Sequence, residues 1–170
     1  MSFKRQGLVA IPPLISLSVL IVSAVSITAQ DKPEFSGRWT ISQAKSSVGA
    51  TGNNATISFP SELVITQRPE ELHVESRYPR SEPQTTVYKF DGSEIAITLP
   101  SNVTERARAS WDGDRLVISA KRVVTSPFGE FVTDVKEIWR RAGNVLTVQK
   151  TQSSEGLTDA ETAVFDRAQP

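Results

Sequence analysis

The stretch Trp111-Asp112-Gly113-Asp114-Arg115-Leu116-Val117-Ile118 carries the pattern on which the fold prediction rests. In it, an Asp-Gly pair follows an aromatic residue and precedes apolar residues spaced two positions apart. Asp-Gly favours a tight two-residue turn between antiparallel strands, because glycine accepts positive φ freely and aspartate tolerates it. Apolar residues two apart place one face of a strand against a core. The stretch therefore predicts a β-hairpin with Asp112-Gly113 as its loop.

Two further stretches repeat the pattern and test it. They are Phe90-Asp91-Gly92-Ser93-Glu94-Ile95-Ala96-Ile97 and the weaker copy Arg141-Ala142-Gly143-Asn144-Val145-Leu146-Thr147-Val148. With each glycine-containing pair taken as a hairpin loop, apolar residues face apolar residues across all three hairpins. The predicted pairs are Tyr88 with Ile95, Ala109 with Leu116, and Trp139 with Leu146. Because a slip of one residue would destroy this match, the three stretches predict three hairpins.

Apolar residues recur every second position through the chain from Phe35 onward, and no stretch has the pattern of an amphipathic helix. The expected strands are Gly37–Ser42, Glu62–Gln67, Leu72–Tyr78, Gln84–Phe90, Glu94–Leu99, Asn102–Trp111, Arg115–Val124, Glu130–Arg140, Val145–Thr151 and Asp159–Asp166. Short links make neighbours antiparallel, so the sequence predicts an all-β, up-and-down meander of about eight to ten strands. Such a sheet buries its apolar face and removes its edges by closing into a barrel or folding over as a sandwich.

The first thirty residues differ from the rest. Lys4 and Arg5 precede an uncharged stretch from 6 to 30, and Ile27-Thr28-Ala29 offers a small-residue cleavage point. This arrangement is typical of a secretory signal peptide. The alternative is a retained membrane anchor, which Pro12-Pro13 disfavours. We expect a signal peptide at 1–29 and a β-barrel domain at 30–170, with no stable membrane span after cleavage.

The composition mainly excludes certain kinds of site and partner. The chain has no cysteine, one histidine (His73), and 19 basic against 19 acidic residues. It therefore has no disulfide scaffold, thiol nucleophile or multi-histidine metal site, and its zero net charge argues against a nucleic-acid partner, which would require a basic stripe. Export without cysteine favours a bacterial protein, secreted or periplasmic, that is stabilised by core burial. We expect no cofactor and no metal.

The start of the predicted domain resembles a known family. Phe35-Ser36-Gly37-Arg38-Trp39-Thr40-Ile41, followed by Ala44-Lys45-Ser46, resembles the opening Gly-x-Trp strand of lipocalin-like (calycin-type) domains, and the whole pattern resembles small secreted bacterial members. The resemblance implies a lipocalin-like barrel with Trp39 packed across its closed end and Arg167 stacked on Trp39. It also implies small apolar ligands in the barrel interior.

Four charged residues share the inward phase of the predicted strands: Glu105, Arg122, Glu137 and Lys150. The expected registers place Glu105 diagonal to Arg122, and Glu137 diagonal to Lys150, with Glu105 and Glu137 toward opposite ends of the barrel. Buried charges are expected to be paired, so these residues are candidates for holding a ligand's polar head. Tyr78, Tyr88 and apolar residues would hold its body. The alternative is that the four charges make ordinary ion pairs at the barrel rim.

These features lead to three functional hypotheses. The first is an exported, non-enzymatic barrel that binds a small hydrophobic or amphipathic molecule. The second is a protein-interaction or envelope-assembly module with a solidly packed barrel, and the third is a barrel enzyme with inward carboxylates. No residue is assigned a catalytic role, because His73 lies in the outward phase. Residues 43–58, rich in Ser, Gly, Asn and Ala, are expected to form a flexible loop that either covers an opening or is simply disordered.

Overall fold

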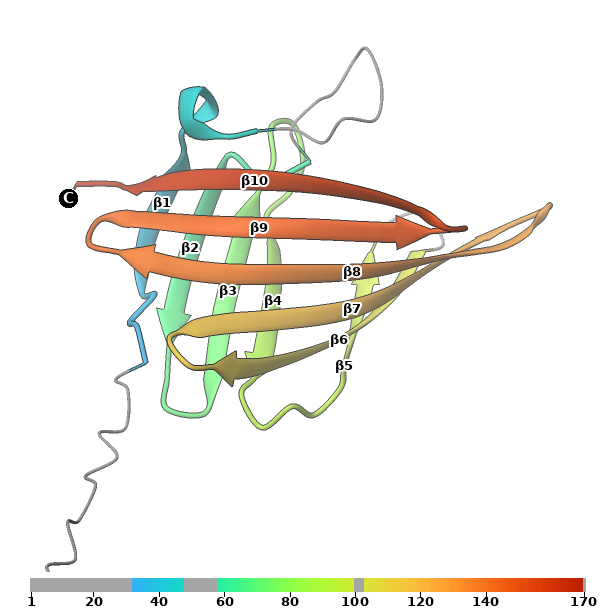
Figure 1. The fold of residues 1–170 in the computed structure, drawn as a ribbon, viewed down its shortest axis with the longest axis horizontal. Helices are drawn as coiled ribbons and strands as arrows, with labels where there is room; N and C mark the ends of the chain where they lie inside the picture. The colour runs from blue at the N-terminus through green and yellow to red at the C-terminus, as the bar shows by residue number, and fades with distance from the viewer. Residues whose placement is uncertain (1–31, 48–57, 100–102, 170) are drawn as a thin grey trace, which may run out of the picture.

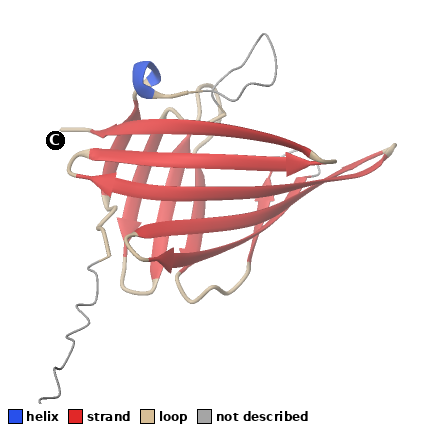
Figure 2. Ribbon diagram, in the orientation of Figure 1, coloured by secondary structure: helices blue, strands red, loops and turns tan. Residues whose placement is uncertain are grey.

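The computed structural model describes residues 32–47, 58–99 and 103–169 (Figure 1). Within these ranges the chain forms ten antiparallel strands in one sheet and one short 3₁₀ helix (Figure 2). The strands are β1 (Gly37–Ile41), β2 (Glu62–Gln67), β3 (Glu71–Arg77), β4 (Gln84–Lys89), β5 (Ile95–Leu99), β6 (Val103–Asp112), β7 (Arg115–Ser126), β8 (Gly129–Ala142), β9 (Val145–Ser154) and β10 (Leu157–Arg167), and the helix is η1 (Gln43–Lys45). The predicted all-β, antiparallel barrel is confirmed.

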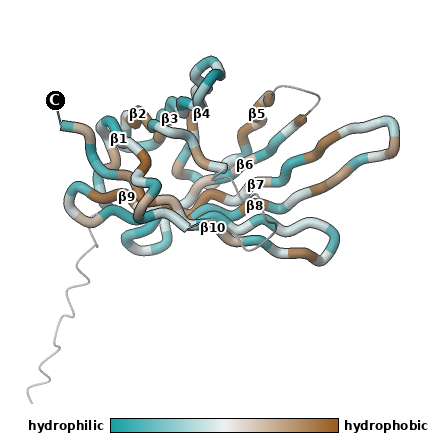
Figure 3. Tube along the Cα trace, turned by 90° about the horizontal axis from the view of Figure 1, so that it is seen from above, coloured by the Kyte–Doolittle hydropathy of each residue, from teal (hydrophilic) through white to brown (hydrophobic). Residues whose placement is uncertain are grey.

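The sheet is a nearly closed barrel. Its strand order is β4-β3-β2-β1-β10-β9-β8-β7-β6-β5, so the first and last strands of the chain pair with each other, with Trp39 opposite Arg167. As a result, β1–β4 and β6–β10 face each other across an interior (Figure 1), and the view from above shows the same enclosure (Figure 3). The edge strands β4 and β5 have no ladder between them.

The predicted hairpin with Asp91-Gly92 as its loop is wrong. Tyr88 lies opposite Leu72 of β3, and Ile95 lies opposite Ala107 of β6. The Asp91 carboxylate accepts a hydrogen bond from the Ser93 backbone N–H at 2.8 Å. This Asx turn satisfies the backbone locally, in place of a ladder between two strands. The chain consequently crosses from β4 to β5 without pairing them.

The other two hairpins form, but in a register two residues away from the predicted one. The observed pairs are Trp111 with Leu116, and Trp139 with Val148. The loops are Gly113-Asp114 and Gly143-Asn144, in which the glycine is the first residue and has φ of 63° and 58°. Positive φ at the first loop position alone is the mark of a type II′ turn, whereas the prediction assumed that Asp-Gly itself formed the loop. Since the offset is even, the apolar faces still meet.

The closed end of the barrel is built on the Gly-x-Trp strand. Trp39 and Phe35 are fully buried, and the Trp39 Nε1 donates a hydrogen bond to the Phe35 carbonyl at 2.8 Å. The Arg167 guanidinium lies over the Trp39 ring at 5.5 Å, as the resemblance implies. Gly37 has φ of 140°, and a Cβ there would lie 3.0 Å from the Arg167 side chain. Glycine is therefore favoured by the backbone conformation, and a larger residue would also press against the Arg167 guanidinium.

Part of the segment predicted as a flexible loop has regular structure. Lys45 of η1 forms an ion pair with Asp166 at 2.8 Å, and Ser47 forms a β-bridge with Thr162 of β10. Residues 48–57 lie outside the described residues, as does the predicted signal peptide at 1–29. In the part of the chain that the structure describes, no helix has the length and apolar character needed to cross a membrane.

Candidate functional site

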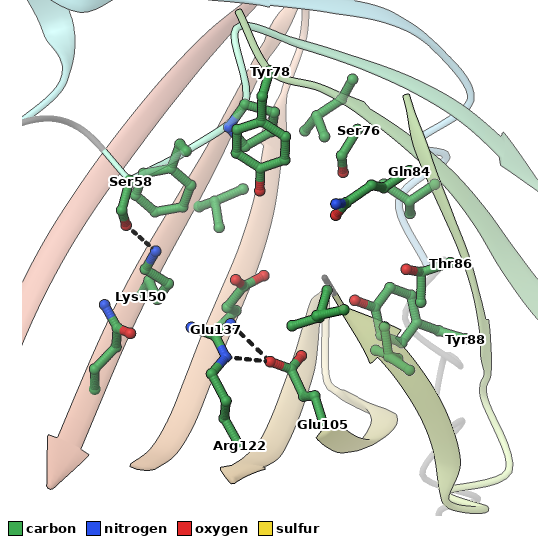
Figure 4. Close-up of a pocket in the computed structure, with 18 of the residues that line it drawn as sticks. Ser58, Ser76, Tyr78, Gln84, Thr86, Tyr88, Glu105, Arg122, Glu137 and Lys150 are labelled. Atoms are coloured by element: carbon green, nitrogen blue, oxygen red, sulfur yellow. Dashed lines mark hydrogen bonds and ion pairs between the residues drawn. The ribbon is translucent and has the colours of Figure 1, made fainter. Parts of the chain in front are cut away.

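The barrel encloses a cavity of about 540 Å³ (Figure 4). Its apolar lining comes from strands on both sides of the interior and comprises Phe59, Pro60, Leu63, Val74, Ile97, Leu99, Val103, Val124, Trp139, Val148 and Phe165. Its polar wall comprises Ser58, Ser76, Tyr78, Gln84, Thr86, Tyr88, Glu105, Arg122, Glu137, Lys150 and Gln152. A cavity of this size matches small-molecule sites in proteins and does not fit a solidly packed barrel.

All six residues predicted as ligand-binding line this cavity: Tyr78, Tyr88, Glu105, Arg122, Glu137 and Lys150. Their positions follow from the alternation along β4 and β6–β9, together with the turn after β3 that holds Tyr78. Glu105 and Glu137 share one cavity, so the expectation that they lie toward opposite ends of the barrel is wrong.

Glu105 and Arg122 form an ion pair on the cavity wall. They lie directly opposite each other in the β6–β7 ladder, and the Arg122 Nε and Nη2 both lie 2.7 Å from the Glu105 Oε2. The predicted diagonal arrangement is wrong because the hairpin loop begins one residue later than predicted, which moves the register by two. Two donors on one carboxylate make a strong, geometrically fixed contact. The Glu105 side chain is 12% exposed, so this charge is largely removed from water.

Lys150 pairs with a residue that the sequence analysis missed. It lies opposite Glu161 in the β9–β10 ladder, with 3.8 Å between the Lys150 Nζ and the Glu161 Oε2. The same Nζ donates to the Ser58 Oγ, and that hydroxyl donates to the Glu161 carboxylate at 2.7 Å. Both charged side chains are 9% exposed, and burial lowers the pKa of Lys150. Glu161 alternates in phase with Ala163 and Phe165, and this pattern could have identified it as an inward-facing residue from the sequence.

Glu137 also lies directly opposite Lys150, in the β8–β9 ladder, but the predicted pair does not form. Among the described residues, no basic group lies within 4.0 Å of its carboxylate. Its Oε2 accepts one hydrogen bond, from the Trp139 Nε1 at 2.9 Å. Burial is the main cause that raises the pKa of Glu137. Burial, followed by the nearby Glu137 carboxylate, also raises the pKa of both Tyr78 and Tyr88, so their hydroxyls stay protonated.

Glu137→Gln is expected to change how stability depends on pH. Above pH 4.5, the ordinary pKa of glutamate, the unfolded chain loses the Glu137 proton while the folded chain keeps it. The folded state then binds more protons, so the free energy of unfolding falls as pH rises toward the raised pKa, by up to about 1.4 kcal/mol per pH unit. Glutamine removes this loss. Urea unfolding of the wild type and of Glu137→Gln from acid to neutral pH measures this difference in pH dependence. Identical dependence of the free energy of unfolding on pH in the two proteins would contradict the prediction.

The remaining polar residues give the cavity neutral hydrogen-bonding groups. Ser76, Gln84, Thr86 and Gln152 offer both donors and acceptors beside the charged pairs. Within the described ranges, no group of three or more His, Asp or Glu side chains is arranged to hold a metal ion. His73 lies next to the outer-face Glu71, at 2.7 Å, and does not line the cavity. The arrangement is suited to holding a molecule that has both polar and apolar parts.

Comparison with solved structures finds the same fold in several proteins. The zebrafish ileal bile acid-binding protein, complexed with cholic acid, matches with a TM-score of 0.57 and 16% identity over 79% of this chain and 98% of its own. A secretory abundant heat soluble protein from Ramazzottius varieornatus matches with a TM-score of 0.53 and 14% identity, covering 83% and 100%. A structure described as the REP1-NXSQ fatty acid transporter matches with a TM-score of 0.52 and 11% identity, over 79% of this chain and 96% of its own.

These matches show that the chain shares the barrel fold of these proteins, and at such identities they show the fold alone. No protein-family model matches the sequence, and a search of curated proteins finds no match.

Proposed function

We propose that this protein binds a small hydrophobic or amphipathic molecule inside its barrel and is not an enzyme. The observation that carries the proposal is the cavity of about 540 Å³, with apolar residues on one part of its wall and polar residues on another. Pockets that bind small molecules combine a mainly apolar lining with a few well-placed polar groups. The fold is shared with a protein whose structure contains cholic acid and with one described as a fatty acid transporter, which supports the same class of ligand.

In this proposal, the six predicted residues contact different parts of the ligand. The Glu105–Arg122 pair, Glu137 and Lys150 contact the ligand's polar group, while the rings of Tyr78 and Tyr88 contact its body. The pairing of Arg122 with Glu105 at 2.7 Å supports this role, because a fixed guanidinium still has N–H groups to offer a ligand. It also argues against Glu105 as a general acid or base, because the ion pair holds its carboxylate in the charged form.

We further propose that the protein acts outside the cytoplasm, as a secreted or periplasmic protein of a bacterium. The signal-like pattern of residues 1–29 supports export, and the absence of cysteine is compatible with a barrel stabilised by burial alone. Neither a nucleic acid nor a metal is part of the proposal. Amino-terminal sequencing of the exported protein tests it: a start near Gln30 is expected, and an intact leader on the exported chain would contradict cleavage.

Filling the cavity is expected to abolish ligand binding. Ser76 lines the cavity from β3, and Ser76→Trp places an indole in the space that a ligand would occupy. Calorimetric titration with decan-1-ol, a neutral amphiphile, should give saturable binding to the wild type and none to this variant.

The matched control is Ser119→Trp, which adds the same side chain on the exposed face of β7. This control should bind decan-1-ol like the wild type. Equal binding by the Ser76→Trp variant would mean that decan-1-ol binds elsewhere, and the proposed site would be wrong.

A further inference from the structure

The charges around the cavity do not balance. Arg122 is paired with Glu105 at 2.7 Å, and Lys150 is paired with Glu161 at 3.8 Å. Each of the two cations near the cavity therefore already has a carboxylate partner. The internal segments outside the described residues, 48–57 and 100–102, contain no lysine or arginine. Among the described residues that line the cavity, the carboxyl group without a cationic partner is that of Glu137.

Glu137 also has unused hydrogen-bonding capacity. A carboxylate has about four acceptor sites, and among the described residues Glu137 accepts one hydrogen bond, from the Trp139 indole at 2.9 Å. Figure 4 shows the Glu137 side chain pointing into the cavity, on the side facing Tyr78. A buried carboxylate that lacks a cation is costly, whereas one that gains a paired donor is stabilised. A bound molecule can supply that donor.

We infer that the ligand carries a protonated amine, which pairs with Glu137, while its apolar part fills the rest of the cavity. This inference rests on the proposed function, since it assigns the ligand's chemistry within the same cavity. The aromatic rings of Tyr78 and Tyr88, which line the same cavity, add favourable faces for a cation. Recognition of an amine differs from what an anionic amphiphile such as a fatty acid would need.

The other charges around the cavity also favour a positively charged ligand. Three acids lie in or beside the cavity, Glu105, Glu137 and Glu161, against two bases, Arg122 and Lys150. A carboxylate ligand would add a further negative charge where both cations already pair with Glu105 and Glu161, and it would leave Glu137 without a cationic partner. An amine ligand leaves both existing ion pairs intact and supplies the cation that Glu137 lacks.

The test compares three probes of equal chain length: decylamine, decan-1-ol and decanoate. At about pH 8 the amine is protonated and the acid is ionised. Calorimetric titration of the wild-type protein should show decylamine binding about tenfold or more tighter than decan-1-ol, and decanoate binding weakest, as expected for one charge-assisted hydrogen bond. Glu137→Gln keeps the side-chain volume and should lower the affinity for decylamine about tenfold while leaving that for decan-1-ol unchanged.

Glu130→Gln is the matched control, because Glu130 is an exposed glutamate on the same strand, β8. It should keep the wild-type order of affinities. Decanoate binding as tightly as decylamine, or an unchanged decylamine affinity in Glu137→Gln, would overturn the amine inference and leave the proposed function standing if decan-1-ol still binds. If none of the three probes binds the wild type, the proposed function fails, and the inference fails with it.

Discussion

Trp39→Ala is expected to lower the free energy of unfolding by about 3–5 kcal/mol, the range for removing a large aromatic side chain from a core. Trp39 has no exposed surface, donates a hydrogen bond to the Phe35 carbonyl, and lies under the Arg167 guanidinium. Alanine removes these contacts and leaves a void where β1 and β10 join to close the barrel. Urea unfolding followed by far-ultraviolet circular dichroism measures the loss.

Phe128→Ala is the control for this prediction. Phe128 is also aromatic but is 94% exposed, so its truncation should change the free energy of unfolding by less than about 0.5 kcal/mol. Similar losses in the Trp39 and Phe128 variants would contradict the assignment of Trp39 to the core of the closed end.

Lys150→Met is expected to cost about 3 kcal/mol or more of stability at neutral pH. The substitution removes the cation from the buried pair with Glu161. Among the described residues, that carboxylate, 9% exposed, then keeps hydrogen bonds from Ser58 only. Breaking one side of a buried ion pair is costly because the remaining charge stays out of water without a counterion. Urea unfolding at neutral pH checks the loss.

The double variant Lys150→Met/Glu161→Gln separates this explanation from lost packing. Removing the unpaired charge should restore most of the lost stability, because replacing both members of a buried pair is often close to neutral. If the double variant is as unstable as Lys150→Met alone, the cost comes from packing around Phe59, whose ring lies 4.4 Å from the Lys150 Nζ, and not from the charge on Glu161.

The sequence predicted the faces of the strands better than their exact partners. Alternation with period two placed Glu105, Arg122, Glu137 and Lys150 on the inner face, and all four line the cavity. Alternation cannot distinguish registers that differ by two residues, because both put the same side chains inside. The choice of Gly113-Asp114 over Asp112-Gly113 as the loop depends on whether Asp112 adopts positive φ, which it does not, and the sequence pattern does not specify this.

The missed residues depend on long-range contacts. Ser58 and Glu161 are 103 positions apart in the chain, and they meet at Lys150 because β10 pairs with both β9 and β1. A hairpin pattern describes neighbours in sequence, so it gave no information on this meeting. Likewise, the Asp-Gly pair at Asp91-Gly92 predicted a turn correctly but could not indicate that β4 and β5 would remain unpaired.

The most direct test of a ligand inside the barrel is native mass spectrometry of the protein isolated from its own host, with Ser76→Trp isolated in parallel. We expect the wild-type protein to carry one small molecule per chain and the cavity-filled variant to carry none, because the indole occupies the space lined by Tyr78, Glu137 and Lys150. A wild-type protein that carries no small molecule, or equal occupancy of the two proteins, would contradict the proposal that the cavity is a binding site.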